Sequence, residues 1–219
     1  MSEADSFIDE VNEEVRRERL FRTLRKYGWI GVLAVVVIVA GAAYNEYSKA
    51  RASAAAQALG DEIVGALGLS GPQMRASALD GIEVDGAVAG VVALLKAAED
   101  LAAEDPAAAV EALTPLAART DIPGVYADLA AFKIVLTGGE AVDRALRDQL
   151  LERLATPGAP FRPLALEQQA IGLAAAGETD AAIAAARALL DEPLVTPALA
   201  RRVTQLLLAL GAEMGNADG

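Results

Sequence analysis

The sequence predicts an all-α protein with one N-terminal transmembrane helix followed by a solenoid of antiparallel helix pairs. Three observations lead to this fold class. An uncharged apolar stretch lies near the N-terminus, and apolar segments of helical length then alternate with short Gly- and Pro-containing breaks. Alanine is abundant while only 4% of the residues are aromatic. Small side chains favour closely packed helices, whereas a β-sandwich is rich in Val, Thr and Tyr.

The charge and composition exclude several classes of function. The 219 residues include 31 acidic and 19 basic side chains, so the formal charge is -12. A net-acidic chain has no electrostatic reason to bind nucleic acid. Cysteine and histidine are absent, which removes thiol nucleophiles, Cys/His metal sites and His-dependent catalysis. An acidic group at helical spacing, Glu99, Asp100 and Glu104, is explained by a charged outer face. We therefore expect a protein that is not an enzyme and needs no cofactor.

Residues 1–26 predict an amphipathic helix in a cytoplasmic tail. Apolar side chains recur about every four residues, at Phe7, Ile8, Val11 and Val15. Two interpretations stay open. The tail could be a solvated stop for the anchor, with its arginines near anionic lipid headgroups. Alternatively, the four apolar side chains dock onto the cytoplasmic face of a membrane partner.

Residues 27–47 predict the transmembrane anchor. Residues 28–44 are apolar throughout, and 17 residues of helix extend about 26 Å, enough to cross the apolar core of a bilayer together with the flanking residues. Aromatic rings that settle at headgroup level lie at both ends, at Tyr27 and Trp29 and at Tyr44 and Tyr47. The stretch therefore has the features of a membrane span.

Basic residues set the expected orientation of the anchor. Only Lys49 and Arg51 follow it closely, against six basic residues before it: Arg16, Arg17, Arg19, Arg22, Arg25 and Lys26. This asymmetry predicts a cytoplasmic N-terminus. Two alternatives are a cleaved signal peptide, because Ala40-Gly41-Ala42 fits a cleavage site, and the core helix of a soluble protein. A leader with seven acidic residues and an apolar segment without a polar face argue against both.

The chain beyond the anchor divides into three predicted parts. Residues 48–85 form a juxtamembrane helix, ending at Leu67, and a Gly/Asp-rich linker; residues 86–211 form the helical domain; residues 212–219 form a disordered C-terminus. Asp105-Pro106 and Thr196-Pro197 place a capping residue before a proline at the first helical position. The predicted helices of the domain are about 87–103, 106–118, 124–137, 140–155, 161–176, 179–191 and 197–210.

These helices fit the 34-residue tetratricopeptide pattern in part. In the best match, residues 163–193, Ala170 and Ala182 occupy the small positions where two helices cross, and Gly177 occupies the turn. Residues 90–123 match less well, because Glu104 stands where the turn glycine is expected. The sequence therefore predicts a tetratricopeptide-like α-solenoid, although an ordinary alanine-rich helical bundle could mimic some of these matches.

The tail "SFIDEVNEEVRRERLFRTLRKYGW", the anchor and "APFRPLALEQQAIGLAAAGETDAAIAAARALL" together resemble the ancillary SecYEG translocon subunit family, the YfgM-type proteins of Gram-negative bacteria. The resemblance covers nearly the whole chain and departs from the family at residues 66–90, where a glycine-rich acidic stretch obscures the first helical pair. It implies an inner-membrane protein with a cytoplasmic N-terminus and a periplasmic C-terminal domain. The implied partners are Sec translocon subunits, a periplasmic peptidyl-prolyl isomerase-like chaperone and secretory polypeptides; no catalytic residue carries over.

A stacked array of helix pairs leaves an extended hollow surface for a partner. The repeat alignment predicts that six side chains could face it: Tyr126, Leu129, Lys133, Leu164, Glu167 and Ile171. An alternative places Leu129, Leu164 and Ile171 in the core between helices, and Lys133 and Glu167 on a solvated face. An alternative function is a structural or assembly subunit of another inner-membrane complex, such as a respiratory one, which would use the same anchor and scaffold.

Overall fold

The computed structural model describes the backbone of residues 3–212 and the side chains of residues 17, 21–22 and 25–212. Within this range the chain folds into α-helices and one short 3-10 helix, and it has no strand. The all-α class is therefore confirmed. The chain divides into two units, residues 1–60 and 61–219. Each unit is described by itself.

The first unit is formed by α1 (Glu3–Leu67) up to residue 60. Residues 25–67 of this helix contain a stretch that is long and apolar enough to cross a membrane, and none of that stretch is buried. The large apolar side chains from Ile30 to Val39 are 47 to 70% exposed. A core helix of a soluble protein would bury such side chains against its neighbours, whereas a membrane span or a signal sequence would not.

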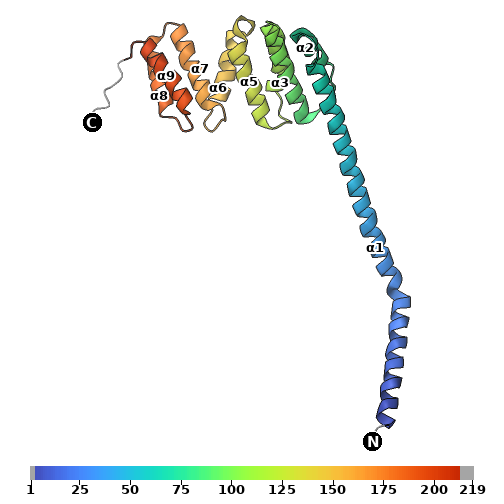
Figure 1. The fold of residues 1–219 in the computed structure, drawn as a ribbon. Coiled ribbons are helices and arrows are strands. Elements are labelled where there is room, and N and C mark those ends of the chain that lie inside the picture. The colour runs from blue at the N-terminus through green and yellow to red at the C-terminus, as the bar shows by residue number, and fades with distance from the viewer. Residues whose placement is uncertain (1–2, 213–219) are drawn as a thin grey trace, which may run out of the picture. The chain divides into compact units, whose positions relative to one another are not determined.

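The second unit contains the end of α1 and eight further α-helices of the described range. They are α2 (Pro72–Asp80), α3 (Gly86–Ala102), α4 (Pro106–Ala117), α5 (Gly124–Thr137), α6 (Arg144–Leu154), α7 (Arg162–Ala175), α8 (Thr179–Leu190) and α9 (Pro197–Ala209). Each helix from α2 onward packs against its neighbours in the chain, and α3 also contacts α5 while α7 contacts α9. Figure 1 shows α2 to α9 following one another in chain order.

All seven helices expected between residues 87 and 210 are present, with two differences nearby. Helix α2 lies inside the stretch that was expected to be a linker, and it packs on α3. Pro72 starts it at the first helical position, and Ala76 and Leu79 are its buried residues. The other difference is the start of α6. Gly139 has φ 48° and begins a 3-10 helix (Gly139–Ala141), so α6 starts at residue 144 instead of 140.

The core of the second unit has two parts. The first lies among α3 to α6 and the start of α7, and it includes Leu113, Ile134 and Leu154, each no more than 1% exposed. The second lies among α7 to α9 and includes Leu189 and Val203. One residue, Leu164 at the start of α7, packs against both parts. Helix α7 is therefore the place where the two cores meet.

Two helix pairs, α3/α4 and α7/α8, use the same turn. The turn residue has a left-handed backbone in both pairs, with φ 61° at Glu104 and φ 79° at Gly177. The backbone N–H of the next residue donates to the carbonyl five residues earlier. Asp105 donates to Asp100 at a distance of 2.9 Å, and Glu178 donates to Leu173 at 3.0 Å. This is the Schellman motif, which normally has glycine at the left-handed position. The glutamate that departs from the repeat pattern therefore adopts the backbone that the pattern requires.

The alanines that the repeat pattern places at the helix crossings are buried in both pairs. Ala97 of α3 and Ala109 of α4 are 1% and 0% exposed, and Ala170 of α7 and Ala182 of α8 are both fully buried. Each residue of the second pair lies 73 positions after its counterpart in the first, as Gly177 does after Glu104. Side chains that end at Cβ allow the two helix backbones of a pair to approach closely.

Candidate interaction surfaces

The predicted membrane-interface residues are exposed on α1. Tyr27, Trp29, Tyr44 and Tyr47 present their rings outward, and the Lys26 ammonium lies 5.6 Å from the centroid of the Tyr27 ring. Four of the predicted topology-setting residues are likewise exposed: Arg17, Arg22, Arg25 and Lys26. The side chains of the other two and of the predicted tail face lie outside the described residues: Arg16, Arg19, Phe7, Ile8, Val11 and Val15.

The candidate residues of α5 lie partly inside the fold. Tyr126, Leu129 and Lys133 are half-buried. Tyr126 packs against the first core, and a Cβ at Gly90 of α3 would lie 3.7 Å from the Tyr126 Cβ. The structure therefore gives Tyr126 a packing role between α3 and α5.

The three candidates of α7 have different environments. Leu164 belongs to the core, as the alternative interpretation had it. Ile171 is 39% exposed and lines a hollow described below. Among the α7 candidates, Ile171 is the one whose side chain a partner can reach.

The position of Glu167 differs from both sequence interpretations. It lies neither on a solvated face nor on an open surface, because it is only 6% exposed. Its two carboxylate oxygens accept hydrogen bonds from the Nε and Nη2 atoms of Arg202 on α9, each with a donor–acceptor distance of 2.7 Å. These hydrogen bonds raise the pKa of Arg202. A buried carboxylate needs such a paired, bidentate partner, so Glu167 holds α7 and α9 together.

Other arginines connect segments in the same way. The Nη1 atom of Arg153 on α6 donates to the Ala117 carbonyl at the end of α4, over 2.8 Å. Arg162 at the start of α7 donates to both carboxylate oxygens of Glu192, over 2.9 and 2.6 Å. These hydrogen bonds lower the pKa of Glu192. Both arginines therefore connect segments of the helix array.

The first candidate surface is a hollow of about 750 Å³ between α6 and α7. Its apolar lining includes Leu151 of α6 and Ile171 and Leu173 of α7. Its polar lining is formed by Arg144, Arg147, Asp148, Gln168, Gln169 and Glu178. A wide hollow with apolar contacts and amide side chains can accept a polypeptide, since amides both donate to and accept from a peptide backbone.

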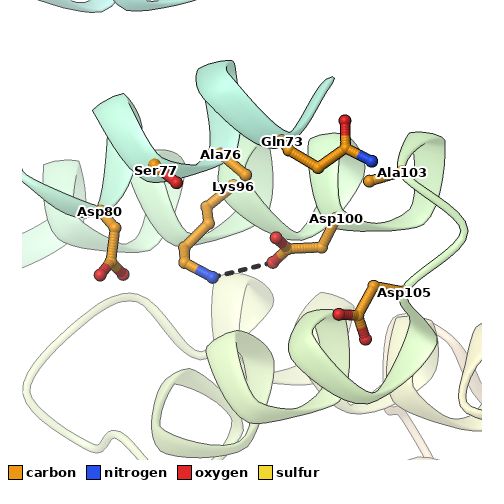
Figure 2. Close-up of a pocket in the computed structure, with 8 residues that line it drawn as sticks. All are labelled: Gln73, Ala76, Ser77, Asp80, Lys96, Asp100, Ala103 and Asp105. Carbon is orange, nitrogen blue, oxygen red and sulfur yellow. Dashed lines mark hydrogen bonds and ion pairs between the residues drawn. The ribbon is translucent and has the colours of Figure 1, made fainter. Parts of the chain in front are cut away.

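The second candidate surface lies over α2, α3 and α4. It consists of two adjoining hollows, of about 300 and 530 Å³, which share Asp80 and Lys96 as lining residues. Figure 2 shows the smaller one, with Asp80 on one side of the ion pair between Lys96 and Asp100, and Asp105 on the other. The Lys96 Nζ and the Asp100 carboxylate are 2.9 Å apart. We refer to the two hollows together as the α2–α4 groove.

The acidic group noted in the sequence does not converge on one point. Glu99 is bound to Arg75 over 2.7 Å, Asp100 is bound to Lys96, and Glu104 is exposed at the turn. Within the described part of the chain, no group of three or more acidic side chains is arranged to hold a metal ion. The geometry of residues 61–212 is that of packed helices with two open surfaces.

Comparison of the chain with protein-family models, with characterised proteins and with solved structures finds no match. The function is therefore inferred from the helix α1, from the repeated turns and from the two open surfaces.

Proposed function

We propose that the chain is a single-pass inner-membrane protein with a cytoplasmic N-terminus, whose periplasmic helical unit binds other polypeptides at the Sec translocon. The observation that carries the proposal is the apolar part of α1, which is long enough to span a bilayer and is not buried anywhere. In water this surface would be costly, at about 25 cal/mol for each Å² of apolar area. A bilayer removes this cost.

The flanks of the apolar stretch support an anchored and oriented helix. Exposed aromatic rings lie at both of its ends, as expected of side chains at the two headgroup regions. Six basic residues precede the stretch and two follow it closely, which favours a cytoplasmic N-terminus. These features favour an anchor over a short basic leader that is cut off.

The repeated helix pairs support a tetratricopeptide-like solenoid. Helices α3/α4 and α7/α8 share the left-handed turn and buried alanines at equivalent positions, 73 residues apart. Each helix packs mainly on its chain neighbours, as in stacked repeat proteins. Such arrays present extended surfaces to protein partners, and the α6/α7 hollow and the α2–α4 groove fit that use.

The translocon assignment depends on the resemblance of the tail, the anchor and residues 159–190 to the ancillary translocon subunits. On this proposal the partners are translocon subunits, a periplasmic peptidyl-prolyl isomerase-like chaperone and emerging secretory polypeptides. A tether at the exit of a channel raises the effective concentration of the helical unit to about millimolar for a short link. Weak contacts with an emerging chain would then suffice.

Site-specific photocrosslinking in native membranes tests the proposal. A crosslinker at Ile171 probes the α6/α7 hollow, and one at Val11 probes the cytoplasmic tail. Leu194 serves as the control, because it is 85% exposed and lines neither candidate surface. Capture of translocon subunits and secretory chains at the two test positions supports the proposal. Capture of respiratory or synthase subunits alone supports the alternative complex, and capture no different from Leu194 contradicts binding at these positions.

The topology needs a separate measurement. A reporter fused after Gly219 should be active only on the periplasmic side, and the chain isolated from membranes should keep the residues before the anchor. A mature N-terminus at Ala43 would identify a cleaved signal peptide. A reporter active only in the cytosol would reverse the orientation.

A further inference from the structure

We propose that the α2–α4 groove binds a polypeptide segment in which apolar side chains are flanked by lysine or arginine. This inference names a class of partner for the helical unit, and it rests on the proposed function in that the occupant is a polypeptide. The groove combines an apolar floor with a rim of carboxylates, and each part selects one feature of the occupant.

The floor of the groove is apolar. Its larger hollow has apolar lining residues that are half-buried or exposed, namely Val84, Ala89, Ala93, Ala112 and Pro115, beside the buried Leu79, Ile82 and Val92. Its volume of about 530 Å³ lies within the range of about 300 to 1,000 Å³ that is usual for ligand-binding clefts. The lining is therefore suited to apolar side chains of a bound segment.

The rim of the groove carries an excess of negative charge. Four carboxylates line it, those of Asp80, Asp100, Asp105 and Glu111, against the single ammonium of Lys96. Lys96 is already bound to Asp100 over 2.9 Å, and the Asp105 carboxylate accepts a hydrogen bond from a backbone N–H of α4 over 2.9 Å. The carboxylates that remain are those of Asp80 on α2 and Glu111 on α4, and both line the larger hollow.

These two remaining carboxylates are open to a ligand. Asp80 and Glu111 are exposed, and neither forms a hydrogen bond or an ion pair with any residue that the structure describes. Asp80 is also the last residue of α2, where the helix dipole disfavours a negative charge. Both carboxylates are therefore accessible to a cation that comes from outside the fold.

The charge also excludes other occupants. Anionic lipid headgroups, nucleic acid and acidic polypeptides would all bring further negative charge to a rim that already has an excess of three carboxylates over ammonium groups. A small inorganic cation would satisfy the rim but would leave the apolar floor in contact with water. A segment with both apolar and basic side chains satisfies both parts of the groove.

The test uses the full-length protein in nanodiscs and two fluorescein-labelled synthetic peptides. One peptide has leucine, valine and alanine residues interspersed with lysines, and the other has glutamate in place of each lysine. Binding is measured by fluorescence anisotropy for the parent protein, for the rim variant Asp80→Asn/Glu111→Gln, and for the control variant Glu140→Gln/Glu152→Gln. The control removes the same charge from exposed positions outside both candidate surfaces.

The basic peptide should bind to the parent protein more tightly than the acidic peptide. The rim variant should bind it about threefold to tenfold more weakly, because each exposed charge contributes a modest amount, and the control variant should match the parent. Unchanged thermal unfolding of the rim variant would show that its fold is intact.

Equal binding of the two peptides, or equal loss in the rim and control variants, would overturn the proposal. These results would leave the proposed function standing if Ile171 still captures polypeptides in the crosslinking experiment. If instead the basic peptide binds through the rim while Ile171 captures nothing beyond the Leu194 control, the groove proposal stands and the α6/α7 hollow is not the site of contact.

Discussion

Replacing Glu104 by glycine should stabilise the helical unit, and replacing Gly177 by alanine should destabilise it. Both residues occupy the left-handed position of the same turn, with φ 61° and 79°. Glutamate strains this backbone because of its Cβ, whereas glycine does not. The Glu104 side chain is exposed and bonds to no other residue of the described structure, so its removal sacrifices no interaction.

The magnitude follows from two opposing effects. A left-handed backbone costs a residue with a Cβ about 1 to 2 kcal/mol. Glycine, however, gives the unfolded chain more freedom, which offsets about 0.4 to 1 kcal/mol of the gain. Glu104→Gly should therefore raise the free energy of unfolding by about 0.5 to 1 kcal/mol, or the midpoint temperature by about 1 to 4 °C. Gly177→Ala should lower it by about 1 kcal/mol; an added Cβ there meets nothing within 4 Å, so the loss is conformational.

Urea unfolding followed by circular dichroism measures both changes. Glu104→Ala is the matched control, since alanine keeps the Cβ and should leave the free energy of unfolding within about 0.5 kcal/mol of the parent value. A destabilised Glu104→Gly variant, or a Gly177→Ala variant as stable as the parent, would refute the claim that the two turns share one strained geometry. The repeat relationship between the two helix pairs would then lose its main structural support.

Three further predictions concern the contacts within the helical unit. Arg202→Met should lower the free energy of unfolding by about 2 to 3 kcal/mol, because it leaves the buried Glu167 carboxylate unpaired; the loss is smaller than for a fully buried pair because the Arg202 side chain is 50% exposed. In urea unfolding, replacing both residues by leucine should recover most of this loss, and a single variant as stable as the parent would contradict the prediction. Arg162 lowers the pKa of Glu192 in the folded state, so the stability from this pair is present at neutral pH and is lost as the pH falls below about 4.5. Arg162→Gln should remove that part of the acid sensitivity in unfolding measured from neutral to acidic pH, and equal acid sensitivity of variant and parent would contradict it. Gly138→Ala should cost about 1 to 3 kcal/mol, since its Cβ would lie 2.7 Å from a backbone carbonyl oxygen of the preceding turn; an unchanged midpoint temperature would exclude this clash.

Helix positions in this chain follow closely from local sequence signals. Asp105 and Thr196 cap helices whose first residue is proline, and both helices begin where the sequence predicts them. Helix α2 was missed because it is short and flanked by glycines, which suggested a loop. The signals for it were present in Pro72 and in the spacing of Ala76 and Leu79. Short helices depend on packing against neighbours for their stability, and that packing is not visible in a short window of sequence.

The candidate site residues were harder to predict because they depend on contacts between distant segments. Glu167 lies 35 residues from Arg202, and a glutamate followed by two glutamines on a helix normally indicates a solvated face. Its burial follows from the packing of α7 against α9. Similarly, the floor of the α2–α4 groove requires α2, which the sequence interpretation treated as a linker. For Ile171 the repeat alignment suggested the hollow face and the alternative suggested the core; the side chain is 39% exposed and lines the α6/α7 hollow.

The position of the α6/α7 hollow follows from the division of the core. Leu151, which lines the hollow from α6, belongs to the first core, and α7 carries the contacts to α8 and α9 that form the second. The two parts of the hollow are thus held by different cores, which meet at Leu164. A polypeptide bound between Leu151 and Ile171 would contact residues held by each of the two cores. If it binds more tightly when the two cores are packed together, its binding stabilises that packing by the same free energy. Binding in this hollow would therefore be coupled to the packing of the two cores at Leu164. Through this coupling the helical scaffold would respond to its partner.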